Sequence, residues 1–281
     1  MAEVTPDDAR RAWRSLEVVH GMIYFAPEAD EEYQGVGIEP GRMGYFASRS
    51  AAMGAVAGEV VVATFFNFEP SLVHGVIPRA WTLTTPDKVL GARHRAVDRA
   101  LRRMLGDDVV ASAEVAEAAD LARTAAEACT PEGRALYAGH ASLPWPDEPH
   151  MVLWHAQTLL REYRGDAHVA ALLLEGLSGL GALVQHAGTG QVPAAVLRSS
   201  RAWSQEAWDA EVASQQAKGW LDADGMLVGE GAALRERVES ATDRATVPPY
   251  AHLGADGSAR LRALGKDLSR TVLANGGVPG R

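Results

Sequence analysis

Hydrophobic residues recur at helical spacing along most of this 281-residue chain, and few segments alternate with the two-residue period of a strand. The clearest helix is Pro86–Leu105, where a proline opens the first turn and apolar residues follow every three or four positions. The stretch GHASLPWPDEPH at 139–150 contains three prolines and interrupts this pattern. The sequence therefore predicts a mainly α-helical protein with a helical, partly irregular and aromatic-rich domain at 1–140 and a second domain at 141–281.

The order of elements after this boundary predicts a winged-helix domain. We expect these elements in succession: a helix at 150–163, a turn at 164–166, a helix from Ala167 capped by Asp166, a tight turn at 176–178, a helix at 179–186, a longer helix after Ser204, two short strands in LDADGMLV, and a closing helix in GEGAALRERVESATDRA. A helix, a two-stranded ribbon and a further helix follow one another in this way in winged-helix domains.

Composition limits the class of protein. The formal net charge is −9, whereas proteins that bind duplex DNA usually present a basic face to the phosphates. The single cysteine, Cys129, excludes an intrachain disulfide framework and a cysteine-rich zinc site. The N-terminal segment MAEVTPDDARRAW lacks the apolar core of a signal peptide, and the apolar run at 169–184 is short for a membrane span. We expect a cytoplasmic protein without a membrane partner.

Neither candidate recognition helix suits DNA. The helix at 179–186 offers only Gln185 and His186 as polar side chains, and the helix at 205–220 carries three carboxylates and one lysine. The segment LDADGML places two aspartates at the tip of the expected wing. Nucleic acid is therefore an unlikely partner on charge grounds, although the glutamines of the second helix leave base contacts open.

One basic helix has two interpretations. Within Pro86–Leu105, Arg95, Arg99, Arg102 and Arg103 share one face. The row is either an ordinary solvated face paired with acidic helices or a surface that follows a phosphate backbone.

Polar residues capable of chemistry concentrate after the proline-rich stretch. His155, Arg161, Arg164, Asp166 and His168 lie within fourteen residues. If the protein is an enzyme, His168 or His155 is the expected acid or base, Asp166 is the orienting carboxylate, and Arg49 or Arg164 binds an anion. The alternative assigns Asp166 to a helix cap, His168 to a neighbouring carbonyl and the arginines to solvent. A metal held by the two histidines and Asp166 matches no standard zinc spacing, so no metal is predicted, and the sequence leaves the cofactor open.

An aromatic group in the N-terminal half forms either one wall of a ligand cavity or a packed aromatic core. Together with residues of the later cluster, it gives the expected ligand-binding set: His20, Tyr24, Phe25, Tyr45, Arg49, Asn67, Trp154, Arg161 and Arg164.

Several short segments carry a family resemblance. The combination of YFAPEA, YFASR, ATFFNFEP, SLPWP, LWHAQTLLREYRGDAHVAAL and RAWSQEAW is similar to an actinobacterial group of MarR-like, SalK-like helix-turn-helix proteins. The segment GWLDADGMLVGEGAALRERVESATDRA resembles the wing and following helix of the MarR type, with VGEG in place of the usual Leu-Thr stretch. The resemblance implies a winged helix-turn-helix fold and the role of a transcription regulator.

Two functional hypotheses follow. In the first, the winged-helix fold has lost its DNA-reading surface and binds a small molecule between the domains, as a binding protein or a natural-product biosynthetic enzyme. In the second, the protein is a ligand-responsive MarR-like regulator that binds DNA. We favour the first. Proteins of this type often form homodimers through their terminal helices, so a homodimer is a further expectation.

Overall fold

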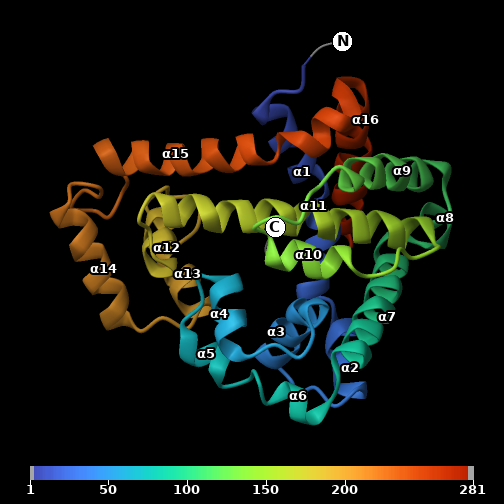
Figure 1. Ribbon diagram of the computed structural model, residues 1–281, viewed down its shortest axis with the longest axis horizontal. Helices are drawn as coiled ribbons and strands as arrows, with labels where there is room; N and C mark the ends of the chain where they lie inside the picture. The colour runs from blue at the N-terminus through green and yellow to red at the C-terminus, as the bar shows by residue number, and fades with distance from the viewer. Residues whose placement is uncertain (1–2, 278–281) are drawn as a thin grey trace.

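The computed structural model describes residues 3–277, which form sixteen α-helices and two short 3₁₀ helices and contain no strand (Figure 1). The elements are α1 (Pro6–Gly21), η1 (Met22–Tyr24), α2 (Pro27–Gly35), α3 (Arg42–Ser50), η2 (Ala51–Met53), α4 (Gly58–Phe65), α5 (Pro70–His74), α6 (Ala80–Leu83), α7 (Pro86–Leu105), α8 (Asp107–Val110), α9 (Ala113–Glu127), α10 (Ala135–Ala141), α11 (Pro149–Leu174), α12 (Gly179–Ala187), α13 (Ala194–Ser200), α14 (Gln205–Ala217), α15 (Gly229–Ala245) and α16 (Val247–Ala274). The prediction of a mainly α-helical chain is confirmed.

Local sequence signals explain where the long helices begin. The Thr5 hydroxyl accepts the backbone N–H of Asp8, and the Thr5 backbone N–H donates to the Asp8 carboxylate, so a capping box stands at the start of α1. At the start of α7 the Thr85 hydroxyl accepts the backbone N–H of Lys88, and Pro86 follows. Prolines at the first helical position cost nothing because the missing N–H has no partner inside the helix.

Helix α11 is the central element of the fold. It crosses the molecule in Figure 1 and packs against α1, α9, α10 and α15, and most of its side chains are buried. Helices α1 and α16 pair along one side and close the main core. That core takes side chains from both sides of residue 140, from Val4 to Val272, and the division of the chain at 140 stays a prediction.

The expected turn at 164–166 does not form, because α11 runs unbroken from Pro149 to Leu174. Gly165 is a weak helix former, but Glu162 and Arg164 beside it make buried ion pairs to other helices. Asp166 caps no helix of its own. Its carboxylate instead accepts the backbone N–H of Tyr137 at 3.0 Å, near the start of α10. Tertiary contacts thus override the local turn signal.

The expected two-stranded wing is also wrong. Among the described residues, the segment between α14 and α15 contains a single antiparallel bridge, between Leu221 and Leu227, and no strand. The Asp222 carboxylate accepts the backbone N–H groups of Asp224 and Met226 at 2.9 and 2.8 Å. These bonds close a tight turn over the residues that strands would need. The fold is a helical one with a helix-turn-helix unit, not a winged helix with a two-stranded wing.

Helices α12, α13 and α14 form that helix-turn-helix unit around their own small core of Leu183, Leu197 and Trp208. The loop after α4 meets this unit closely. A Cβ atom at Gly179 would lie only 2.0 Å from the carbonyl oxygen of Phe66, and Trp203 donates its indole N–H to the carbonyl of Asn67 at 2.9 Å. The unit is therefore docked on the N-terminal half of the chain.

No individual helix in residues 3–277 combines the length and the apolar character that crossing a membrane requires.

Candidate functional site

A buried ion-pair network lies where α1, α3 and α11 meet. Arg49 donates two hydrogen bonds to the carboxylate of Glu162, at 2.9 and 3.0 Å, and both side chains are buried. Arg161 reaches the same carboxylate at 3.0 Å and pairs with Glu17 of α1 at 2.9 Å. With His20, these four residues make up what we call the polar centre.

Charge neutralisation keeps the network ionised at neutral pH. Burial raises the pKa of Glu162, but the positive charges of Arg49 and Arg161 outweigh it and bring the pKa to about 2. Burial likewise lowers the pKa of Arg49, and the Glu162 charge raises it above the usual value. The pair is charged on both sides at pH 7.

Aromatic rings surround the Arg49 guanidinium. Its central carbon lies 4.4 Å from the ring centroid of Phe65 and 5.4 and 5.6 Å from those of Tyr45 and Tyr24. Arg49 also donates to the hydroxyl of Tyr45 at 2.7 Å. The aromatic group expected from the sequence therefore encloses a charged group.

His20 completes the polar centre as a neutral ring. Its two nitrogens lie 3.0 Å from the Tyr24 hydroxyl and 3.1 Å from the Thr158 hydroxyl, and its ring stacks on Trp154 at a centroid distance of 5.2 Å. Burial lowers its pKa well below the usual range, and the charge of Arg161 lowers it further. One nitrogen therefore accepts a hydrogen bond while the other donates.

Six of the expected ligand-binding residues meet in or beside the polar centre: His20, Tyr24, Tyr45, Arg49, Trp154 and Arg161. Phe25 points to solvent and is 55% exposed. Asn67 contributes its backbone carbonyl to Trp203 and lies at the junction with the helix-turn-helix unit.

The remaining polar residues of α11 are spread along the helix. Arg164 pairs with Asp243 at 2.8 Å, and His168 lies 3.0 Å from the Thr242 hydroxyl. Asp166 faces α10, where burial raises its pKa to about 6. His155 lies eleven residues before Asp166, about 16 Å along the axis of one straight helix. The structure thus does not bring His155, Asp166 and His168 together, and no group of three metal-ligating side chains occurs within 3–277.

Besides Glu162, the buried polar residues Arg93 and His140 were not singled out from the sequence. Arg93 of α7 is 2% exposed, lies 5.0 Å from the Trp154 ring centroid and donates to the carbonyl of Ser48. His140 of α10 is also 2% exposed. A signal for Arg93 was present, because it lies four residues from both Val89 and Val97 on the apolar face of its helix.

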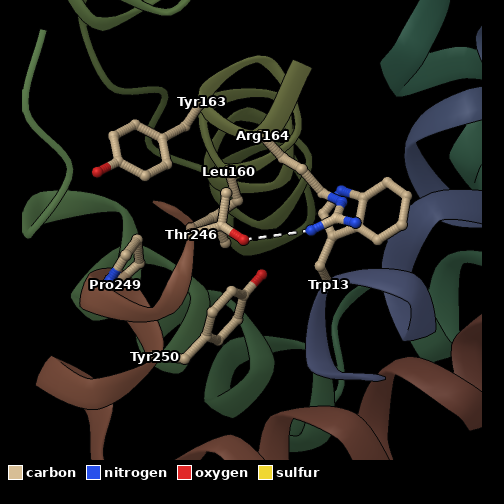
Figure 2. Close-up of a pocket in the computed structure, with 7 residues that line it drawn as sticks. All are labelled: Trp13, Leu160, Tyr163, Arg164, Thr246, Pro249 and Tyr250. Atoms are coloured by element: carbon tan, nitrogen blue, oxygen red, sulfur yellow. Dashed lines mark hydrogen bonds between the residues drawn. The ribbon is translucent and has the colours of Figure 1, made fainter. Parts of the chain in front are cut away.

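A small cavity opens between α1, α11 and the start of α16 (Figure 2). It leaves no room for a water-sized molecule, and Figure 2 shows Arg164 hydrogen-bonded to Thr246, with the Tyr250 ring below them. Sites for drug-sized ligands usually measure about 300–1,000 Å³. This cavity is too small for such a ligand.

The outward face of α14 is acidic. Its exposed positions include Glu206, Asp209, Ala210, Ala213 and Ala217, while Trp208 and Gln215 point into the protein. Its last turn is followed by Lys218, whose amine lies over the Trp220 ring at 4.5 Å. Carboxylates at the beginning of a helix that enters a DNA groove would meet the phosphates.

The arginine row of α7 is neutralised within the chain. Arg95 and Arg99 pair with Glu32, at 2.8 and 3.0 Å, and Arg99 also reaches Glu31. The other two arginines of the row pair as follows: Arg102 with Asp98 and Asp107, and Arg103 with Glu28. The row therefore matches the first interpretation, a solvated face paired with acidic helices.

Comparison with known protein families identifies the group to which this architecture belongs. A model described as a helix-turn-helix family matches residues 9–279. The chain belongs to this helix-turn-helix family. No curated protein and no solved structure matches the chain. For this helix-turn-helix protein, function has to be argued from its own surfaces and buried groups.

Proposed function

We propose that this helix-turn-helix protein does not read DNA with α14, and that its helical body binds a small molecule beside the polar centre. The observation that carries the proposal is the outward face of α14, which presents Glu206, Asp209 and three alanines where a DNA reader presents donors. Its exposed Gln205 amide donates to the Asp209 carboxylate at 2.7 Å. The narrower resemblance to MarR-like or SalK-like proteins stays a prediction, as does a homodimer through the terminal helices.

Charge elsewhere in the helix-turn-helix unit supports the first half of the proposal. Residues 178–228 contain three arginines or lysines and five aspartates or glutamates. The turn after α14 carries Asp222 and Asp224 where a wing would approach a phosphate. Affinity for duplex DNA comes largely from neutralised phosphates, so this unit lacks the usual source of binding free energy.

The polar centre supports the second half. A buried ion pair seldom stabilises a fold more than an apolar pair of the same volume would. Folding stability alone therefore gives little reason for Arg49 and Glu162 at these positions. Around them lie the Tyr24 and Tyr45 hydroxyls and the neutral His20 ring, which can donate or accept hydrogen bonds. A small number of convergent polar groups among aromatic rings is typical of small-molecule sites. A reaction on a natural product remains a separate prediction.

A thermal-shift screen tests the binding half. Compounds that raise the Tm of the wild-type protein should lose that effect in Tyr24→Phe, which removes the hydroxyl beside His20 and keeps the ring. Tyr137→Phe is the matched control, because its buried hydroxyl bonds to the Cys129 carbonyl away from the polar centre. Compounds that act equally on all three proteins would contradict binding beside the polar centre. Salt-sensitive duplex binding would instead favour the ligand-responsive regulator.

A further inference from the structure

We propose that Arg93, His140 and His155 form a binding site for a small oxyanion, of the carboxylate or phosphate class. The inference deepens the proposed function, on which it rests, by naming the charged group of the ligand. It does not depend on whether α14 contacts DNA.

Three helices bring these residues together. Arg93 comes from α7, His140 from α10 and His155 from α11, and α11 packs against both other helices. The Arg93 guanidinium lies over Trp154, the residue before His155, and its charge lowers the pKa of both histidines. Trp154 also stacks on His20, so this group adjoins the polar centre.

All three side chains have polar atoms without a partner. Within residues 3–277, the Nε and Nη2 atoms of Arg93 and the Nε2 atoms of His140 and His155 are buried and make no hydrogen bond. The three residues are 2%, 2% and 7% exposed. Buried polar groups are nearly always hydrogen-bonded, so four unpaired nitrogens in one neighbourhood are exceptional.

Because Arg93 is positively charged, the partner that these unpaired nitrogens lack should be an anion. A guanidinium stays protonated, and removing it from water without a counter-charge is costly. The other buried arginines have such a counter-charge: Arg49 pairs with Glu162 and Arg164 with Asp243. Arg93 has no carboxylate partner among the described residues, and its one hydrogen bond goes to the Ser48 carbonyl. An oxyanion would supply both the charge and the acceptors.

The histidines suit the same ligand. Burial lowers the pKa of His140 to about 3 and that of His155 to about 4, and the Arg93 charge adds to both effects. Both rings are therefore neutral at pH 7, and each can donate one N–H to an oxygen atom. Two neutral donors beside one fixed positive charge match a small monoanion better than a metal ion.

One member of this group contacts a partly exposed tryptophan. Trp145 lies edge-on to His155 at a centroid distance of 4.8 Å, in the loop between α10 and α11. A surface hollow of about 230 Å³ lies at this loop. It is lined by Pro146 and Asp147, which directly follow Trp145, and by Arg123 of α9.

Thermal unfolding with acetate, benzoate and inorganic phosphate tests the inference, with chloride at equal ionic strength as reference. We expect at least one oxyanion to raise the Tm of the wild-type protein in a concentration-dependent way. Arg93→Met should abolish the rise, and Arg93→Lys should weaken it because the ammonium lacks the planar fork. Arg237→Met is the matched control, since Arg237 of α15 is exposed and pairs with Glu175 and Glu230. It should respond as the wild type does.

Nuclear magnetic resonance of ¹⁵N-labelled histidine gives a second measurement that needs no arginine variant. The oxyanion should shift the Nε2 signals of His140 and His155, which the variants His140→Gln and His155→Gln assign. The Nε2 signal of His252, an exposed histidine of α16, should stay in place. A response to carboxylates alone or to phosphate alone names the source of the anion. Unchanged signals and Tm in the wild type, or equal responses in Arg93→Met, would overturn the site. Compounds whose effect depends on Tyr24 would then still support the broader proposal.

Discussion

Glu162→Gln is the most informative single perturbation of the fold, because it removes the one carboxylate that Arg49 contacts. Arg49 is 7% exposed and would keep its charge without a partner. Breaking a buried ion pair in this way typically costs about 3–5 kcal/mol. The lowering of the Glu162 pKa to about 2 by the charges of Arg49 and Arg161 has the same sign. We therefore expect the free energy of unfolding at pH 7 to drop by about 3 kcal/mol.

The pH dependence of this loss follows from the sign of the pKa shift. Because the folded-state pKa of Glu162 is lowered, its stabilising effect is present above the unfolded value of about 4.5 and is lost as the pH falls toward about 2. The stability difference between wild type and Glu162→Gln should therefore be constant between pH 6 and 8 and shrink below about pH 4.5.

Urea unfolding followed by circular dichroism over a pH series measures both effects. Glu117→Gln is the matched control, because Glu117 pairs with Arg260 on the surface and both side chains are largely exposed. An exposed pair contributes about 0–1 kcal/mol. If the two variants lose equal stability, or if the loss for Glu162→Gln does not change with pH, the argument for a buried, ionised network is refuted.

Three further predictions concern other parts of the chain. Burial raises the pKa of Asp166 to about 6, so Asp166→Asn should raise the Tm at pH 8. The variant should have little effect near about pH 2.5, where the carboxyl is protonated in the folded and unfolded states alike, and a lower Tm at pH 8 would contradict this. Gly179→Ala would place a Cβ atom 2.0 Å from the Phe66 carbonyl oxygen, so hydrogen exchange in α12 should accelerate, and unchanged exchange would show that the contact yields freely. The double variant Glu206→Lys, Asp209→Lys should gain duplex binding that weakens with salt in a fluorescence anisotropy assay; no gain would mean that α14 cannot approach DNA for reasons other than charge.

The long helices could be predicted from the sequence because their signals are local. Pro86 after a capping threonine and apolar residues at helical spacing determine α7, and Thr5 with Pro6 determines α1. The continuity of α11 through Gly165 could not be predicted in this way, since it depends on ion pairs to residues more than seventy positions away in the sequence, such as Asp243. The wing lacks strands where the Asp222 carboxylate accepts the N–H groups of Asp224 and Met226, and the sequence does not show which N–H groups it accepts.

Part of the polar centre could be picked out from the sequence as residues, but not as an arrangement, and the binding role of these residues stays a prediction. The concentration of aromatic residues marked Tyr24, Tyr45 and Arg49, and the structure places Arg161 among them through Glu162, which the sequence did not single out. His155 and His168 are separated because α11 is one unbroken helix, whereas the sequence predicted a turn between them. Such partners are set by tertiary packing, which a single sequence does not display.

The most direct test of the central claim is a salt-titrated binding assay of the wild-type protein against random and genomic-fragment duplex DNA. With α14 acidic and the α7 arginines paired within the chain, we expect no binding even at about 50 mM salt, where phosphate contacts are strong. Tight binding that falls steeply between about 50 and 200 mM salt would contradict the account and identify the protein as a DNA-binding regulator.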